Sequence, residues 1–415
     1  MATTHVGSPA TREALHRRTL AVVMASQVFS GAGLAAGVTV GALLAESMLG
    51  TTSLSGLPSA LFTAGSAATA LLIGRLSQRL GRRAGLTAGY VTGALGGVGV
   101  VLAATMDNVP LLLVSLLVYG AGTATNLQAR YTGADLALPD RRGRAVSAVL
   151  VATTLGAVAG PNLVTVTGRA AEQWHIPALA GPFVLATVGY GVAAALLFVL
   201  LRPDPLLVAR VLTAEEADPR PDGAPGRPRP VRAGVTAGAA TMVLTQLVMV
   251  AVMTMTPVHM KAHGHGLGAT GLVIAVHIAG MYLPSPITGV LVDRVGRIPV
   301  AVASGVTLLA AGVVSATAPE SSVALLALAL GLLGLGWNLG LVSGTAIITD
   351  AAPPQSRART QGAVDLCVAL AGAGGGIASG MIMNATSYAA LSVTGGVLAL
   401  AVIPFVASSG RRARY

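Results

Sequence analysis

The chain of 415 residues is 53% hydrophobic and only 10% charged, and it carries a formal net charge of +11. Because apolar runs of about 20 residues, long enough to cross the hydrocarbon of a bilayer, recur from end to end, we expect a polytopic membrane protein. The single cysteine, Cys367, excludes an internal disulfide, and the lack of a GxxxxGK[ST] sequence excludes an ATP-driven motor within this chain.

Taken in chain order, the apolar runs predict twelve transmembrane helices in two six-helix bundles, an all-α fold. The predicted spans cover residues 19–46, 53–74, 84–105, 109–134, 145–168, 178–201, 233–257, 270–292, 299–318, 322–348, 360–383 and 388–408. The first run is too long for the core of a signal peptide and has no convincing cleavage site, so we expect it to be retained.

The spans divide the chain into five predicted regions. These are a tail (1–18), a first bundle (19–201), a linker rich in proline and charge (202–232), a second bundle (233–408) and a short tail (409–415). Nearly all of the 26 Lys and Arg residues fall on alternate connections, which the positive-inside rule assigns to the cytoplasm. We therefore expect a bacterial inner-membrane protein with both termini cytoplasmic, and no nucleic-acid partner.

An internal repeat relates the two predicted bundles. GRLSQRLGRR at 74–83 aligns with GVLVDRVGRI at 289–298, and PDRRGRAVSAV aligns with PPQSRARTQGAV so that Arg144 pairs with Arg359. Both alignments shift the sequence by the same number of positions, the repeat offset. A constant offset indicates a duplication. Parallel repeats of six spans are typical of transporters that bind their substrate near the middle of the membrane.

These repeated sequences resemble the loop signature of the major facilitator superfamily, roughly GxxxDRxGRR. The resemblance implies a transporter of the major facilitator fold and not an enzyme, with a cytoplasmic gate formed by paired charges and helix ends. The gate residues that it implies are Arg79, Arg82, Asp293, Arg294 and Arg297. Gln78 stands where the family usually has aspartate, so the first copy lacks the customary carboxylate.

Methionine and histidine recur at helical spacing in the seventh and eighth predicted spans. Met249 and Met253 lie four residues apart, as do His277 and Met281, so each pair shares one face of a helix. At about 1.5 Å of rise per residue, the four side chains descend from roughly 6 Å to roughly 16 Å below the outer surface. Three thioethers and an imidazole suit Cu(I) better than zinc, manganese or magnesium. Packing by methionine is the structural alternative.

This pair of motifs, MxxxM followed by HxxxM, resembles that of the CcoA-like copper importers. The resemblance implies a secondary transporter that imports copper, its cargo and not a cofactor, by alternating access. A cytoplasmic copper chaperone is the protein partner that such a function implies. The same branch contains riboflavin transporters, and GAVAGP at 156–161 resembles a drug/proton antiporter signature. A small-organic-molecule transporter therefore stays open as the alternative, although the 3% aromatic content argues mildly against a planar cargo.

Three further features have both a functional and a structural explanation. The outer-loop residues His259, Met260, His263 and His265 form a candidate capture site for metal, or a solvated loop. Asp365 is a candidate for proton coupling, or pairs with a basic residue, and Asn338 either touches cargo or bonds a neighbouring helix. Arg130 is expected to extend toward the inner membrane surface.

Overall fold

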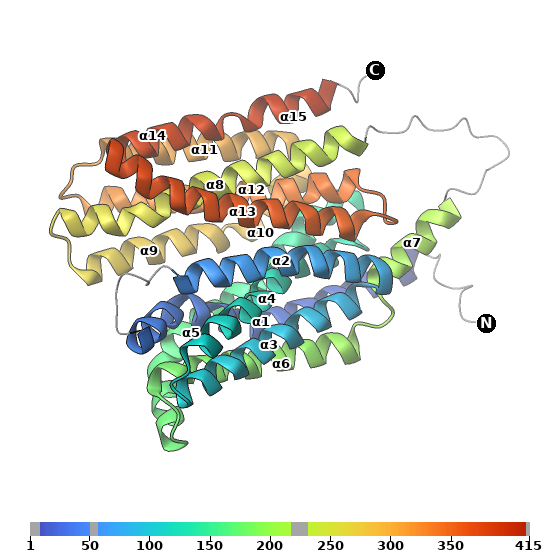
Figure 1. The fold of residues 1–415 in the computed structure, drawn as a ribbon. Helices are drawn as coiled ribbons and strands as arrows, with labels where there is room; N and C mark the ends of the chain where they lie inside the picture. Colours follow the sequence, from blue (N-terminus) through green and yellow to red (C-terminus); the bar gives the residue numbers. More distant parts are fainter. Residues whose placement is uncertain (1–8, 50–56, 217–230, 412–415) are drawn as a thin grey trace. The chain divides into compact units, whose positions relative to one another are not determined.

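The computed structural model describes residues 9–49, 57–216 and 231–411, all of them in helices and short connections. The α-helices are α1 (Pro9–Leu49), α2 (Leu57–Leu80), α3 (Arg82–Thr105), α4 (Val109–Ala134), α5 (Arg142–Gln173), α6 (Gly181–Leu200), α7 (Pro205–Glu216), α8 (Val231–Ala262), α9 (Leu267–Tyr282), α10 (Ser285–Arg294), α11 (Arg297–Thr317), α12 (Val323–Ala351), α13 (Arg357–Ala385), α14 (Tyr388–Ala399) and α15 (Val402–Arg411). Figure 1 shows their arrangement.

The predicted membrane spans agree with these helices. Ten helical segments of the described residues are long and apolar enough to cross a membrane, and they coincide with ten of the twelve predicted spans. The two remaining predictions fall on α1 and α5, which are helices of 41 and 32 residues. The all-α membrane fold is therefore confirmed. The side chains of 157–162, which include most of GAVAGP, lie outside the described part.

Proline divides two of the predicted spans. The eighth comprises α9 and α10, which meet at Pro284, and the twelfth comprises α14 and α15, which meet just before Pro404. Proline has no N–H and clashes with the preceding turn, so a helix breaks readily at it, although α8 continues through Pro257. The break before α10 leaves the Met281 carbonyl to accept a hydrogen bond from the Asn338 side chain of α12, at 2.7 Å.

Polar side chains and glycines set several helix boundaries. Asn108, Ser322 and Ser387 accept hydrogen bonds from the first turns of α4, α12 and α14, as N-cap residues do. The α2–α3 and α10–α11 turns contain Gly81 and Gly296 at φ of 94° and 109°, a region that favours glycine. The two glycines are separated by the repeat offset, so the repeat includes the turn itself.

The predicted linker contains a helix that composition did not indicate. Helix α7 begins at Pro205, and the Asp204 carboxylate accepts hydrogen bonds from the N–H groups of Leu206 (3.0 Å) and Leu207 (3.2 Å). Proline at the first helical position and aspartate before it are typical of a helix start. The helices α1 and α15 also extend into the predicted tails, while 217–230 lie outside the described residues.

Contacts divide the chain into two compact units that differ slightly from the predicted bundles. Unit 1 comprises Met1–Ala137, Ala148–Gly223 and Pro354–Leu366, and unit 2 comprises Leu138–Ser147, Ala224–Pro353 and Cys367–Tyr415. Each unit therefore includes one short segment from the other half of the sequence. These two segments are the starts of α5 and α13 with their preceding turns, and they correspond within the repeat.

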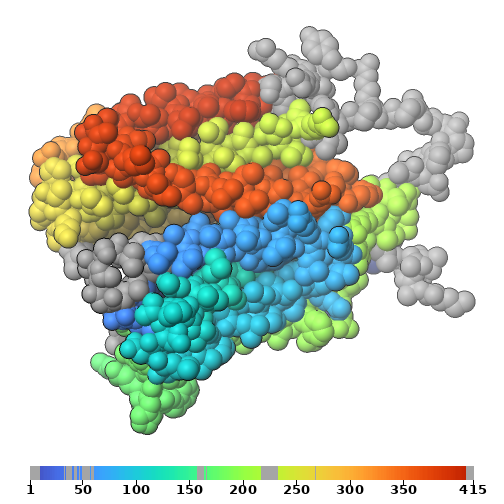
Figure 2. Space-filling model, in the orientation of Figure 1, coloured from blue at the N-terminus to red at the C-terminus, as the bar shows by residue number. Residues whose placement is uncertain are grey.

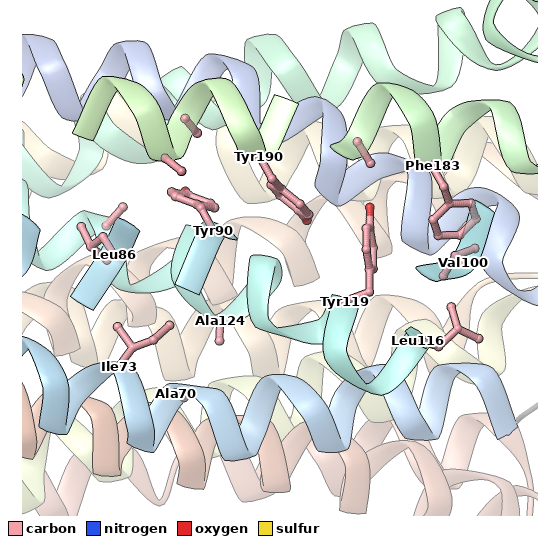
Figure 3. Packing of buried hydrophobic residues seen from close by; sticks show 14 of the residues in the cluster. Ala70, Ile73, Leu86, Tyr90, Val100, Leu116, Tyr119, Ala124, Phe183 and Tyr190 are labelled. Carbon is pink, nitrogen blue, oxygen red and sulfur yellow. The ribbon is translucent and has the colours of Figure 1, made fainter. Parts of the chain in front are cut away.

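Aromatic rings fill the core of unit 1. Tyr119 packs edge-on against Phe183 with ring centroids 5.3 Å apart, and Tyr90 stacks on Tyr190 at 5.7 Å (Figure 3). Glycines on α1, α3 and α4 make room for them, since a Cβ at Gly122 would lie 2.4 Å from the Tyr190 ring. Few but well-placed aromatic residues thus join α3, α4 and α6.

Helix α12 is the central helix of unit 2. It packs against α8, α9 and α11, while α14 lies beside α11 and α8 (Figure 1). Close approach to α9 depends on Gly334, where a Cβ would lie 2.3 Å from the backbone oxygen of His277 and 2.8 Å from the nitrogen of Met281. Both neighbours are backbone atoms, so the contact has little freedom to adjust.

Gly334→Ala is expected to lower the midpoint of thermal unfolding in detergent, because overpacking typically costs about 1–3 kcal/mol. The matched control is Gly271→Ala on α9, where a Cβ meets nothing within 4 Å. The control should leave the midpoint unchanged or raise it slightly. Equal midpoints for the two variants would contradict the packing described for α9 and α12.

Candidate functional site

The start of α5 is held by a carboxylate from α10. Asp293 accepts hydrogen bonds from the backbone N–H groups of Gly143 (2.8 Å) and Arg144 (3.0 Å) and from the Arg144 guanidinium (3.1 Å). A negative charge at a helix N-terminus satisfies unpaired N–H groups and complements the helix dipole. The predicted gate residue Asp293 thus acts in unit 2 as the cap of α5.

The start of α13 is held in the same way by Gln78, on α2 in unit 1. Its side-chain oxygen accepts from the N–H groups of Ala358 (2.9 Å) and Arg359 (3.3 Å). Its amide nitrogen donates to the carbonyls of Pro354 (3.2 Å) and Gln355 (2.7 Å). The first copy lacks a carboxylate, as the sequence indicates, but the amide keeps both N–H contacts and adds two donors.

A buried ion pair lies next to the Gln78 cap. Arg82 and Asp135 are joined at 2.7 Å, and both side chains are 0% exposed. Arg357, at the start of α13, contacts the same carboxylate at 3.8 Å, and Gln361 accepts a hydrogen bond from Arg82. These interactions connect α3, the end of α4 and the start of α13 within unit 1.

Unit 2 contains the corresponding ion pairs, and their side chains are more exposed to solvent. Asp350 pairs with both Arg142 and Arg297, and its side chain is 23% exposed. Arg297 also donates to the Pro139 carbonyl. Each of the three charged residues is separated from its unit 1 counterpart by the repeat offset. The repeat therefore includes a charge triad, one copy buried and one partly open to solvent.

The five residues predicted for the gate differ in their contacts. Arg82, Asp293 and Arg297 form the interactions above, whereas Arg79 and Arg294 are exposed and make no ion pair within the described part of the chain. Sequence reasoning missed the other partners, which are Asp135, Arg142, Asp350 and Arg357. The constant repeat offset between like charges could have identified them.

A second buried ion pair lies deeper in unit 1. Arg130 on α4 bonds the Asp365 carboxylate of α13 at 2.6 Å, and Tyr131 donates to the same oxygen at 3.0 Å. Arg130 is 1% exposed, so the expectation that it extends to the membrane surface is wrong; a carboxylate within reach holds it inside. The second Asp365 oxygen is buried without a hydrogen-bond partner in the described residues.

Several buried polar side chains of unit 1 form one network. Gln27 donates to Thr153 (2.9 Å) and to the Asn126 carbonyl (3.0 Å), and Tyr90 donates to the Gln27 oxygen. Ser30 accepts from Asn126 at 2.9 Å. All of these residues are buried, and they connect four helices. Hydrogen bonding between helices, as opposed to a free polar surface, accounts for their presence.

The candidate copper ligands lie on two helices that both pack against α12. His277 is 0% exposed, and its Nδ1 lies 2.9 Å from the Leu330 carbonyl oxygen. Because a carbonyl only accepts, Nδ1 carries the hydrogen, and the buried Nε2, which has no partner in the described residues, carries a lone pair. Met249 is buried, Met253 and Met281 are half-buried, and few residues of α8 and α9 meet.

The residues predicted as an outer loop lie partly in α8, which continues to Ala262 and includes His259 and Met260, and they bond other residues of unit 2. His263 bonds the His259 carbonyl at 2.8 Å and the Glu320 carboxylate at 3.1 Å, and His265 bonds the Glu320 carbonyl at 2.6 Å. The His259 ring stacks on Tyr388, and Met260 is buried. Among the described residues, no three side chains of His, Cys, Asp and Glu form a group able to hold a metal ion.

An aromatic and amide cluster lies in the same unit. Trp337 on α12 donates to the Gln246 oxygen of α8 at 2.7 Å, and the Tyr282 ring of α9 lies edge-on to Trp337 with centroids 5.9 Å apart. The Gln246 amide nitrogen makes no hydrogen bond within the described residues, and it lies 3.1 Å from the position that a Cβ of Gly372 would take. Asn338, one residue further, bonds Met281 and Ser285.

The two charge triads differ in burial, so removing a carboxylate from each should lower stability by different amounts. Asp135→Asn leaves Arg82 buried without a counter-charge, which typically costs about 3–5 kcal/mol. Asp350→Asn alters a partly exposed triad, which we expect to cost about 1 kcal/mol or less. Thermal unfolding of the two purified variants in detergent should show a clearly lower midpoint for Asp135→Asn. Equal midpoints, or the reverse order, would contradict the burial of the unit 1 triad.

Comparison with known proteins agrees with this architecture. A model of the Major Facilitator Superfamily matches residues 20–281 and 238–413. YdeG of Bacillus subtilis (strain 168), described as an uncharacterized MFS-type transporter, is 57% identical over 410 residues, which cover 98% of this chain and 95% of that protein. The riboflavin transporter RfnT of Brucella anthropi is 28% identical over 393 residues, covering 94% and 95%.

A solved structure gives the same fold. The MFS proton:xylose symporter XylE, bound to 6-bromo-6-deoxy-D-glucose, superposes with a TM-score of 0.75 at 17% identity and covers 96% of both chains. At this identity the likeness concerns the fold alone. The family model and the 57% identical relative show that the chain belongs to the Major Facilitator Superfamily, as a multi-pass membrane transporter and not an enzyme.

Proposed function

We propose that this protein moves a small planar organic solute, of the riboflavin type, across the bacterial inner membrane by alternating access. The observation that carries the proposal is the cluster of Trp337, Tyr282 and Gln246 within the spans of unit 2. Aromatic rings bind a planar ring system by stacking, and an amide bonds its polar edge. The low aromatic content of the chain matters less when two of its rings lie together.

Similarity to a named transporter supports the same proposal. RfnT, a riboflavin transporter, aligns along nearly the whole chain at 28% identity. The network of polar groups inside unit 1 is satisfied internally, whereas the Gln246 amide nitrogen has no hydrogen-bond partner in the described residues. A donor left open beside two aromatic rings suits the carbonyl edge of a flat heterocycle.

The proposed gate consists of the two capped helix starts. Opening would release the start of α13 from Gln78 and Arg82, and the start of α5 from Asp293 and Arg297. From the positive-inside rule we expect both on the cytoplasmic side. Gln78 is neutral, so water can replace its four hydrogen bonds at little electrostatic cost.

Copper import is the second candidate, favoured by one observation. The Nε2 lone pair of His277 is buried and has no hydrogen-bond partner among the described residues, and Met281 lies one helical turn further along the same helix. An imidazole and thioethers are ligands that suit Cu(I). Among the described residues, no three His, Cys, Asp or Glu side chains form a group able to hold a metal ion, so copper binding would depend on methionine sulfur.

The first experiment measures uptake of labelled riboflavin and of copper by cells that lack their own importers. Wild type should take up riboflavin, and Trp337→Ala should raise the KM about fivefold, since one stacking contact is worth about 1 kcal/mol. Trp174→Ala is the matched control, because that tryptophan is 67% exposed. Equal KM values for the two tryptophan variants, or no riboflavin uptake by wild type, would reject the organic-solute proposal.

The copper arm of that experiment uses different variants. If copper is the cargo, His277→Ala and Met281→Ala should abolish its accumulation, while Met381→Ala, at a methionine that is 70% exposed, should not. Copper uptake that all three variants retain, or its absence in wild type, would remove the second candidate. Membrane expression of each variant is matched by immunoblot.

Proton coupling through Asp365 gives a separate prediction. If its unpartnered oxygen takes up the coupling proton, Asp365→Asn should abolish accumulation driven by a pH gradient but retain exchange of labelled for unlabelled solute. Arg130→Gln/Asp365→Asn is the matched variant, because it removes the uncompensated charge of Arg130 that would otherwise lower stability. Accumulation at the wild-type level in the double variant would contradict a coupling role.

A further inference from the structure

A groove lined by apolar side chains runs between α3 and α6 in unit 1. Its volume is about 360 Å³, and its walls include Val91, Leu95 and Val98 of α3 and Gly191, Ala195 and Phe198 of α6. The two helices pack side by side (Figure 1), and their surfaces adjoin on the face shown in Figure 2. Both helices are candidate membrane spans, so the groove lies at hydrocarbon depth.

The groove results from unequal side chains on its two walls. On α3 the wall residues recur at every third or fourth position, and Leu95 is 63% exposed. On α6 they are mostly glycine and alanine, and a Cβ added at Gly191 would meet nothing within 4 Å. A hydrocarbon chain can therefore lie along α6 between the larger side chains of α3.

Two cations lie at one end of the groove. Helix α3 begins at Arg82 and α6 ends at Leu200, so both termini are at the same end of the spans. There the guanidinium groups of Arg83 and Arg202 lie 5.3 Å and 5.9 Å from the centroid of the Phe198 ring. Cation–π contact at this distance holds both groups next to the groove wall.

These two arginines have no carboxylate partner in the described part of the chain. The nearby Asp204 carboxylate accepts instead from the backbone N–H of Arg83 (2.8 Å) and from the first turn of α7. Arg83 is half-buried and Arg202 is exposed, so both can reach an external anion. Two guanidinium groups and one nearby carboxylate therefore leave this end of the groove with a net positive charge.

We propose that this groove binds an anionic phospholipid of the bilayer, with an acyl chain between α3 and α6 and the phosphate on Arg83 and Arg202. Apolar walls and paired guanidinium groups match the two parts of such a lipid. The end of the groove that carries the arginines is the one that the positive-inside rule assigns to the cytoplasmic leaflet. The bound lipid would stabilise unit 1 without taking part in transport.

The test compares lipids and variants by thermal unfolding of the full-length protein in detergent. Dioleoyl phosphatidylglycerol should raise the unfolding midpoint of wild type by several degrees, since a ligand that binds only the folded state stabilises it. Dioleoyl phosphatidylcholine, and inorganic phosphate at the same concentration, should have little effect. Arg83→Gln/Arg202→Gln should lose at least half of the shift, whereas Arg169→Gln, at an exposed arginine of α5, should keep it.

The acyl-chain part of the proposal has its own variant. Gly191→Leu fills the groove where there is open space, so it should fold normally and yet reduce the shift produced by phosphatidylglycerol. Gly374→Leu, at another glycine with nothing near its Cβ, should retain the full shift. A shift that both Gly191→Leu and the double arginine variant retain would overturn the proposal. If inorganic phosphate produced the same shift, the arginines would form a simple anion site, and the phospholipid proposal would be overturned.

Discussion

An arginine removed from water needs a carboxylate, and this requirement decides which segments of unit 1 must stay together. Arg82 and Arg130 are both buried, and their carboxylates come from the end of α4 and from α13. Removing either carboxylate would leave a buried charge without compensation, a loss of about 3–5 kcal/mol. The Arg130–Asp365 pair, together with the contacts of Arg357 and Gln361 to the Arg82–Asp135 pair, accounts for the presence of residues 354–366 in unit 1.

The two copies of the repeat use the same positions with different electrostatics. In unit 2 a carboxylate, Asp293, caps α5 and also pairs with Arg144, while in unit 1 the neutral Gln78 caps α13. The charge triads differ in the opposite sense, because the unit 1 triad is buried and the unit 2 triad is partly exposed. Each unit thus combines one strong and one weak attachment, and neither helix start depends on a single interaction.

The membrane spans and the repeat could be predicted from the sequence alone. An apolar run is a local property of the sequence, and a constant offset between two similar segments is found by comparing their residue numbers. The breaks at Pro284 and before Pro404 followed from proline chemistry only once the helices were in place. Helix α7 was not predicted, since its start depends on the Asp204 cap within a segment of linker composition. Asp135 and Asp350 were not predicted, because only their tertiary partners distinguish them from other acids at span ends.

The candidate cargo residues were harder to predict, because ligation and packing use the same side chains. His277 is fully buried in unit 2, yet one of its nitrogens bonds the Leu330 carbonyl, which fixes the ring toward α12. Trp337 and Gln246 lie far apart in the sequence, and nothing in it indicates that they meet. Their hydrogen bond uses the only donor of the indole and one acceptor site of the amide, and under the proposed function the amide nitrogen would donate to the solute. Selectivity of this transporter would then depend on a donor that faces an acceptor on the cargo, a requirement that a carbonyl-bearing heterocycle meets and a copper ion does not.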